Sequence, residues 1–205
     1  MKYIQIGGVK IELTNEQVTR LKKDLEEIAV RVSDIEVGDT FKLAGYEFVV
    51  LEWLENGIAV ILKDLWKNEE VFGNSNKYTG SNVDELCEEF KKELSVRCGA
   101  DIFIEHTVDL TSDDGLKDYG SITRKVSLLT AEQYRRYVSI LDKHKPDAWW
   151  WLSTPHSTKT HGSDSWIKCV SPDGNINDYR YNFNYGVRPF CILKSNIFVS
   201  KQGGE

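Results

Sequence analysis

The sequence predicts a mixed α+β protein, and three observations support this fold class. Short apolar stretches alternate with polar residues and stop at turn signals such as Gly7-Gly8 and Asn56-Gly57, which is typical of β-hairpins. Three segments begin with a helix-capping residue that is followed by an apolar face of helical period. No internal repeat or low-complexity tract interrupts this pattern.

Residues 1–33 predict a β-hairpin followed by an amphipathic helix. Alternation across Tyr3–Leu13 gives the hairpin, and Thr14 with Gln17 matches a capping box that opens a helix with an apolar face reaching Val32. So few residues bury little apolar surface by themselves. We therefore expect this segment to serve docking or assembly, and its helix to permit a homodimer.

Residues 36–200 predict the main domain. Strands are expected around the Ala44-Gly45 turn and over Gly57–Leu62, whereas residues 67–80 and 107–122 are expected to be loops. A second helix should begin at Ser81, and Thr130 should cap a third. The inner face of the third helix is expected to consist of Tyr134, Tyr137, Val138 and Leu141. From Ala148 onward, short strands and turns should dominate, with a turn at Pro172-Asp173-Gly174.

Composition narrows the classes of function. The chain has 205 residues and a net charge of −6, which argues against broad binding of phosphate backbones and is compatible with a basic partner. The N-terminus has no long apolar core of a signal peptide, and no stretch reaches the length of a membrane span, so the expected location is the cytoplasm. The cysteines, none of which forms a CxxC motif, are expected to be free buried thiols: Cys87, Cys98, Cys169 and Cys191.

Three adjacent tryptophans, residues 149–151, raise the question of an exposed aromatic site. Successive residues of a strand face opposite sides, so the three rings cannot share one face. All three belong to the core if both faces of the sheet are covered; otherwise one is exposed and suits a sugar, a base or a protein. We take Trp150 as the exposed ring.

Familiar catalytic and metal motifs are missing from the sequence, and no cofactor is expected. His156 and His161, with Cys169 downstream, match no compact zinc pattern and read as loop histidines. The stretch that starts at Asp173 lacks the glycine and glutamate positions of an EF-hand, which leaves only a loose calcium site near Asp178 as an alternative. A catalytic serine or cysteine motif is also absent.

The polar segments after the tryptophan run instead resemble a recognition surface. Tyr, Asn and Arg are dense here, and these residue types serve adaptable binding surfaces. We expect residues 156–165 and 178–185 to form the binding face, with these contact residues: Trp150, His156, Lys159, His161, Asp178, Tyr179, Arg180, Tyr181 and Tyr185.

An ordered set of motifs resembles the DUF6273 family, which is found in Firmicutes, their prophages and gut phages. The motifs are Val37-Gly38-Asp39-Thr40-Phe41, Gly45-Tyr46-Glu47-Phe48, Val126-Ser127-Leu128-Leu129-Thr130, Trp150-Trp151-Leu152-Ser153-Thr154-Pro155 and Tyr185-Gly186-Val187-Arg188-Pro189-Phe190. The resemblance covers about residues 36–200. Ser153-Thr154 departs from the Arg-Ser that the family usually shows at this place.

The family resemblance implies a C-type-lectin-like fold. The closing motif of the sequence is also similar to that of domains of the formylglycine-generating-enzyme type and of retroelement variable proteins, which have this fold. That fold has short twisted antiparallel sheets, two helices and long loops, and it binds ligands through loops. Arg188 is expected to play a structural role by pairing with a carboxylate or with loop carbonyls.

Three hypotheses of function follow. The first is a non-enzymatic, phage-associated interaction module that binds a protein or a glycan, in the host cytoplasm or on the virion. The second is an inhibitor of a host defence nuclease, similar to an anti-CRISPR protein, that presents the acidic residues of 84–89 and 109–118 to a basic channel without itself binding nucleic acid. The third is a cysteine-based enzyme, which requires Cys169 and Cys191 to lie close together and exposed in a cleft.

Overall fold

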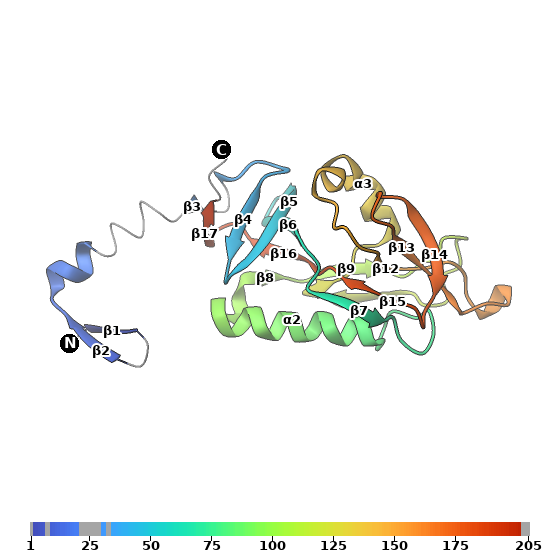
Figure 1. Ribbon diagram of the computed structural model, residues 1–205, viewed down its shortest axis with the longest axis horizontal. Coiled ribbons are helices and arrows are strands. Elements are labelled where there is room, and N and C mark those ends of the chain that lie inside the picture. The colour runs from blue at the N-terminus through green and yellow to red at the C-terminus, as the bar shows by residue number, and fades with distance from the viewer. Residues whose placement is uncertain (1, 7–8, 21–29, 32–33, 202–205) are drawn as a thin grey trace.

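The computed structural model describes residues 2–6, 9–20, 30–31 and 34–201. The helices are α2 (Asn82–Cys98) and α3 (Ala131–Leu141), with short 3-10 turns η2 (Ala100–Ile102), η3 (Asp142–His144) and η4 (Lys159–His161). The strands are β1 (Lys2–Ile6), β2 (Val9–Leu13), β3 (Val30–Arg31), β4 (Thr40–Leu43), β5 (Tyr46–Leu54), β6 (Gly57–Leu62), β7 (Lys67–Val71), β8 (Phe103–Ile104), β9 (His106–Asp109), β10 (Ser121–Arg124), β11 (Val126–Ser127), β12 (Trp150–Pro155), β13 (Trp166–Val170), β14 (Ile176–Arg180), β15 (Asn184–Val187), β16 (Phe190–Lys194) and β17 (Phe198–Lys201). The predicted α+β class is confirmed (Figure 1).

The larger sheet has eight strands in the order β11-β16-β6-β5-β4-β17-β3, and β8 also pairs with β16. Its central strand β5 carries a continuous apolar run because both faces of the sheet are covered. Phe48 and Val50 belong to the core that includes α2, whereas Val49 and Leu51 belong to the core that includes α3. Alternation along one strand therefore supplies two hydrophobic cores.

The predicted hairpin between β4 and β5 turns at two residues with positive φ. Ala44 has φ 54° and Gly45 has φ 87°, and Leu43 pairs directly with Tyr46. This is the backbone hand that tight hairpins favour. The Arg97 guanidinium, at the end of α2, donates a hydrogen bond of 2.8 Å to the Ala44 carbonyl and holds the turn against the helix.

The smaller sheet has five strands in the order β14-β13-β12-β15-β7. Most of its pairs are antiparallel, but β12 runs parallel to β15, with Trp150 opposite Gly186. The predicted turn at Pro172–Gly174 is confirmed and joins β13 to β14, with Gly174 at φ 87°. Tyr134 of α3 donates a 2.7 Å hydrogen bond to the Gly174 carbonyl, so the helix fixes this turn.

The caps of α2 and α3 agree with the sequence prediction. The Ser81 hydroxyl accepts a hydrogen bond from the Asp84 amide, and Thr130 with Gln133 forms a complete capping box. Val138 corrects the predicted inner face of α3, because it is 38% exposed while the other three members of that face are buried. The sheet covers a narrower stripe of the helix than the apolar pattern indicates.

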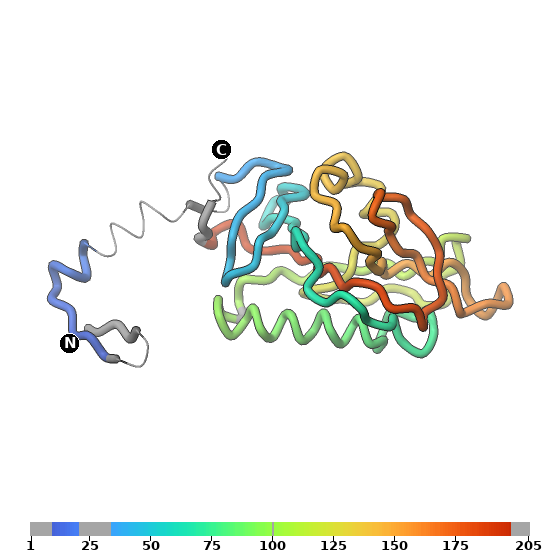
Figure 2. Tube along the Cα trace, in the orientation of Figure 1, coloured from blue at the N-terminus to red at the C-terminus, as the bar shows by residue number. Residues whose placement is uncertain are grey.

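Two segments predicted as loops contain strands. β7 pairs with β15, which follows it by more than a hundred residues, and Figure 2 shows the two traces running alongside each other. β9 and β10 form a separate two-stranded sheet. Both segments are rich in polar residues because they lie at sheet edges, where one side of the strand stays in water.

The N-terminal hairpin is confirmed as the pair β1 and β2. The Thr14 amide donates to Gln17 Oε1 at 2.9 Å and the Gln17 amide donates to Thr14 Oγ1 at 3.2 Å, so the predicted capping box is present, and residues 15–20 are helical. Residues 21–29 and 32–33 of the predicted helix lie outside the described residues. The helix prediction is wrong at Val30 and Arg31, which form β3 and pair with β17. Among the described residues, no helix has the length and apolar character needed to cross a membrane.

Candidate binding site

The tryptophan run divides between two cores and the surface. Trp150 is 1% exposed and packs in the α3 core, and Trp151 is buried in the α2 core. Trp149 precedes β12 and is only half-buried. The prediction that Trp150 is the exposed ring is therefore wrong: α3 covers its face of the sheet, with Tyr134 in edge contact at 5.7 Å.

Trp149 belongs to an aromatic cluster that reaches the surface. Its ring stacks on Tyr185, with centroids 5.3 Å apart and planes at 18°, and meets Tyr179 edge-on at 5.2 Å. Tyr185 also contacts buried Trp151 at 4.7 Å, and exposed Phe183 lies 5.3 Å from Tyr179. The cluster is thus anchored in the core at one end and open to solvent at the other.

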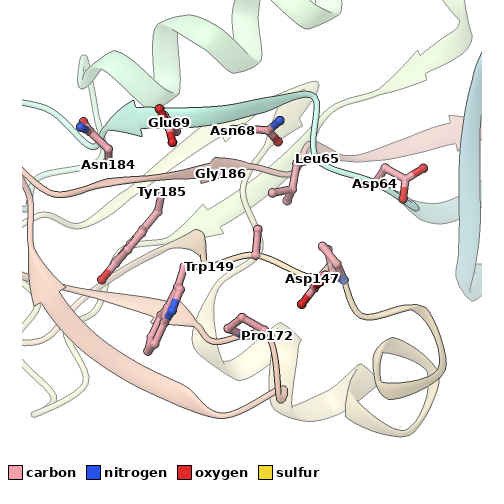
Figure 3. Close-up of a pocket in the computed structure, with 12 residues that line it drawn as sticks. Asp64, Leu65, Asn68, Glu69, Asp147, Trp149, Pro172, Asn184, Tyr185 and Gly186 are labelled. Atoms are coloured by element: carbon pink, nitrogen blue, oxygen red, sulfur yellow. The ribbon is translucent and has the colours of Figure 1, made fainter.

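Beside this cluster lies an open cleft of about 690 Å³. Its lining comes from the β6–β7 connection, β7, the segment before β12, the turn after β13, and β15. The lining residues are Asp64, Leu65, Asn68, Glu69, Pro146, Asp147, Ala148, Trp149, Pro172, Asn184, Tyr185 and Gly186. Figure 3 shows the rings of Trp149 and Tyr185 side by side, with Pro172 and Asp147 near Trp149 and Asp64 farther along the cleft.

The floor of the cleft depends on a glycine. Gly186 is buried, and a Cβ atom there would lie 2.3 Å from Leu65 Cδ1. The Gly186 amide donates a 2.8 Å hydrogen bond to the Trp149 carbonyl. Glycine therefore lets the segment before β12, the β6–β7 connection and β15 approach one another closely.

The polar side chains of the cleft are not used by the fold. Within the described residues, no hydrogen bond or ion pair engages the side chains of Asn68, Glu69, Asp147 or Asn184. Asp64 likewise lacks such a bond, although its charge helps the buried Arg188 to remain protonated. The cleft thus combines an aromatic face with free carboxylate and amide groups, which is the composition of a ligand site.

The predicted loop of residues 156–165 has a different character, because its side chains are paired within the protein. His161 Nδ1 lies 2.9 Å from Asp114, and exposed Lys159 lies 3.2 Å from Asp164. Hydrogen bonds from Ser112, Ser157 and His161 hold the pKa of Asp114 well below its usual range. The loop is therefore braced by carboxylates of the β9–β10 connection.

A buried asparagine, which drew no attention in the sequence, also anchors this loop. Asn76 Nδ2 donates to the carbonyls of Ser157 and Trp166, both at 2.8 Å, and Asn76 Oδ1 accepts from Tyr119 at 2.8 Å. Its amide nitrogen and its amide oxygen are thus both paired within the protein. Its role is structural.

His156 and Asp178 of the predicted face meet, but around a buried lysine. Lys168 is 8% exposed and lies 2.8 Å from Asp178 and 2.7 Å from Asp113. His156 Nδ1 lies 3.3 Å from Asp178. Burial lowers the pKa of Lys168, but the two carboxylates outweigh this effect and raise it. Asp178 therefore compensates a charge of the protein and is not open for a loose calcium site.

The remaining predicted contact residues divide between core and surface. Tyr179, Tyr181 and Tyr185 are half-buried against the α2 core, and Arg180 is exposed over the Trp166 ring at 5.8 Å. Of the whole predicted set, the structure places only Tyr185 in the lining of the cleft. Tyr179 lies outside the lining but contacts the rings of both Trp149 and Tyr185.

Arg188 plays the structural role that the sequence predicts. Its guanidinium donates hydrogen bonds to the carbonyls of Leu62, Lys63 and His144 at 2.7 to 2.9 Å. The departure at Ser153-Thr154 also has a structural use, because Thr154 Oγ1 accepts a 2.9 Å hydrogen bond from the Ala131 amide at the start of α3.

The thiols do not provide the exposed pair that the enzyme hypothesis requires. Cys169 and Cys191 are both fully buried, and burial raises the pKa of the Cys169 thiol to about 12. Cys87 is buried too, whereas Cys98 is half-buried, so the prediction of buried thiols fails at Cys98. A buried protonated thiol is a poor nucleophile.

Several carboxylates of the acidic faces proposed for nuclease inhibition are paired within the protein. Asp84 is 3% exposed, and both of its oxygens accept hydrogen bonds from Arg124, at 2.7 and 2.8 Å. Asp113 and Asp114 are paired as described above. These carboxylates hold the fold together and do not form a free negative surface.

Most residues that line the cleft are not indicated as site residues by the sequence. Asn68 and Glu69 lie in the segment of residues 67–80 that is predicted as a loop, and the pairing of β7 with the distant strand β15 brings them to the cleft. Asp64 lies just before that segment, in the β6–β7 connection. One local signal was available: Asp147 and Trp149 flank Ala148 directly before a buried strand. An aromatic residue and a carboxylate directly before a buried strand could have indicated a ligand site.

The fold and the cleft define a mixed α+β domain with an aromatic cleft on its smaller sheet. The chain belongs to the DUF6273 family, a domain of unknown function, whose family model matches residues 56–195. This confirms the predicted family over a somewhat shorter range than the motifs indicate. No curated protein and no solved structure matches the chain.

Proposed function

We propose that the protein is a non-enzymatic interaction module that binds a protein or a glycan at the cleft of Trp149 and Tyr185. One observation carries this proposal. The polar side chains of residues 156–165 are largely paired within the protein, whereas those that line the cleft are not. Pockets with aromatic walls and a few free polar groups are the usual form of ligand sites. The proposal keeps the recognition role and moves its centre from residues 156–165 to the cleft.

The lectin-like architecture and the phage association remain parts of this proposal. A lectin-like domain binds through irregular segments beside its sheets, and the lining of the cleft from strand ends and connections is compatible with that mode. The host cytoplasm or the virion is the proposed location, and the N-terminal segment is proposed to serve docking or assembly.

Glycan and peptide arrays test the proposal with three forms of the full chain. Wild type should bind a subset of probes, and a Trp149→Ala, Asn184→Ala double variant should lose that binding. Lys159→Ala, which changes an exposed residue of the braced loop, should behave like wild type. Binding that survives in the double variant and disappears in Lys159→Ala would return the site to the loop and refute the proposal.

Nuclease inhibition is the alternative, and the structure offers it less support. Asp84, which begins the predicted acidic face of residues 84–89, is buried against Arg124, so this face offers less free negative charge than the sequence indicates. A direct assay with defence nucleases and their DNA substrates separates the two: inhibition that does not depend on Trp149 favours the alternative.

A further inference from the structure

The cleft carries negative charge that no basic side chain of its own lining neutralises. Asp64, Glu69 and Asp147 are exposed in its lining, and the lining contains no lysine, arginine or histidine. Buried Arg188 interacts with Asp64, but its hydrogen bonds go to three carbonyls. Grouped carboxylates in a concave site attract a cation from solution.

The aromatic side of the cleft is suited to the same kind of ligand. The face of a tryptophan or tyrosine ring attracts a cation, and a guanidinium also stacks on the ring plane. This chain already pairs guanidinium groups with aromatic rings: Arg97 lies over Tyr46 at 5.6 Å and Arg188 over Trp150 at 5.2 Å. Within the described residues, no such cation lies over Trp149.

From this charge complementarity we infer that the cleft binds an arginine side chain of a basic polypeptide segment. The guanidinium would stack on the face of the Trp149 ring opposite Tyr185 and donate to the carboxylate of Asp147, while Asn68 and Asn184 offer amide oxygens. Leu65 and Pro172 would contact the aliphatic stem. The inference rests on the proposed function and names the ligand class of the same site.

The size of the cleft favours a polypeptide over a free small cation. Its volume of about 690 Å³ is that of a site for a drug-sized ligand, which is more space than one small cation fills. The net charge of −6 attracts a basic segment over a longer distance as well. One arginine would fill the aromatic end, and neighbouring residues would occupy the end at Asp64.

Fluorescence anisotropy with the full chain tests the inference. The probes are labelled nine-residue peptides with a central arginine, the same peptides with citrulline, free arginine and spermidine as competitors, and neutral oligosaccharides. Arginine peptides should bind, binding should fall with added salt, and citrulline should lose most of the affinity, because it keeps the shape and removes the charge.

Matched variants locate the binding. Trp149→Ala should weaken arginine peptides about 2- to 30-fold, the range of a lost cation–π contact. Asp147→Asn should weaken them up to about fivefold, the range of an exposed ion pair. Asp64→Asn should weaken them to a similar extent, and its thermal unfolding is measured alongside because Asp64 also interacts with the buried Arg188. Glu55→Gln, an exposed carboxylate in the β5–β6 turn, is the control and should bind like wild type.

The results separate this inference from the proposed function. Equal binding of citrulline peptides, or tighter binding of spermidine at the same residues, overturns the arginine assignment. Oligosaccharide binding that depends on Trp149, without peptide binding, overturns the inference and leaves the proposed function standing. If no probe binds in a way that depends on Trp149, both are overturned.

Discussion

The loop of residues 156–165 and the cleft of Trp149 are both rich in polar side chains, but the molecule uses them differently. In the loop, histidine and threonine side chains meet carboxylates of the β9–β10 connection, and Lys159 pairs with Asp164 of the loop itself. In the cleft, carboxylates and amides face solvent beside an aromatic pair. Residue type alone therefore does not reveal a binding surface, because the deciding property is whether the fold has already paired the polar group.

The largest expected effect on stability comes from comparing a core tryptophan, Trp150, with the tryptophan of the cleft, Trp149. Trp150→Ala should lower the free energy of unfolding by about 3–5 kcal/mol, because it removes a buried ring from the α3 core. Trp149→Ala should lower the free energy of unfolding distinctly less, since that ring is half-buried, while it weakens ligand binding at the cleft. Urea unfolding of both variants measures the difference. Equal losses of stability would contradict the division of the tryptophan run.

The next effect tests the internal pairing beneath the loop. Lys168→Met should lower the free energy of unfolding by about 3 kcal/mol or more, because Asp113 and Asp178 would lose their buried counter-charge. Thermal unfolding at neutral pH provides the measurement. A variant as stable as wild type would show that Arg135 and His156 suffice for the two carboxylates.

A third prediction concerns acid. The pKa of Asp114 is lowered by its hydrogen bonds from Ser112, Ser157 and His161, and that of Asp118 by hydrogen bonds from Thr158 and Thr160. A carboxyl group whose folded pKa is depressed stabilises the fold above its unfolded pKa and loses this contribution as the pH falls. Loop amides should therefore lose hydrogen-exchange protection below about pH 4. Asp114→Asn should show faster loop exchange already at pH 7; unchanged exchange would show that Asn76 alone holds the loop.

The smallest expected effect is at the edge of the loop. Lys159 is 83% exposed in its pair with Asp164. Lys159→Ala should change the free energy of unfolding by less than about 0.5 kcal/mol, because exposed ion pairs contribute little. Ligand binding at the cleft should also be unaffected. A larger loss would mean that the pair helps to order the loop.

Local signals carried the successful parts of the sequence prediction. The capping residues Ser81 and Thr130 each mark a helix start through a pattern of only four consecutive residues. The Ala44-Gly45 turn marks a hairpin through a similarly short pattern. β7 failed because its letters, Lys-Asn-Glu-Glu-Val, resemble a loop when its partner β15 is unknown. An edge strand keeps one side in water, so its polarity hides it.

By itself, the sequence determined the α+β class, the helix starts, the tight turns and the family. Strand alternation also required that the tryptophans divide between two faces. Only the tertiary structure decided which ring remains at the surface, because this depends on where α3 covers the sheet. It likewise decided that Asp64, Asp147 and Tyr185 share one cleft, since pairings between distant segments bring them together and no local pattern encodes such pairings.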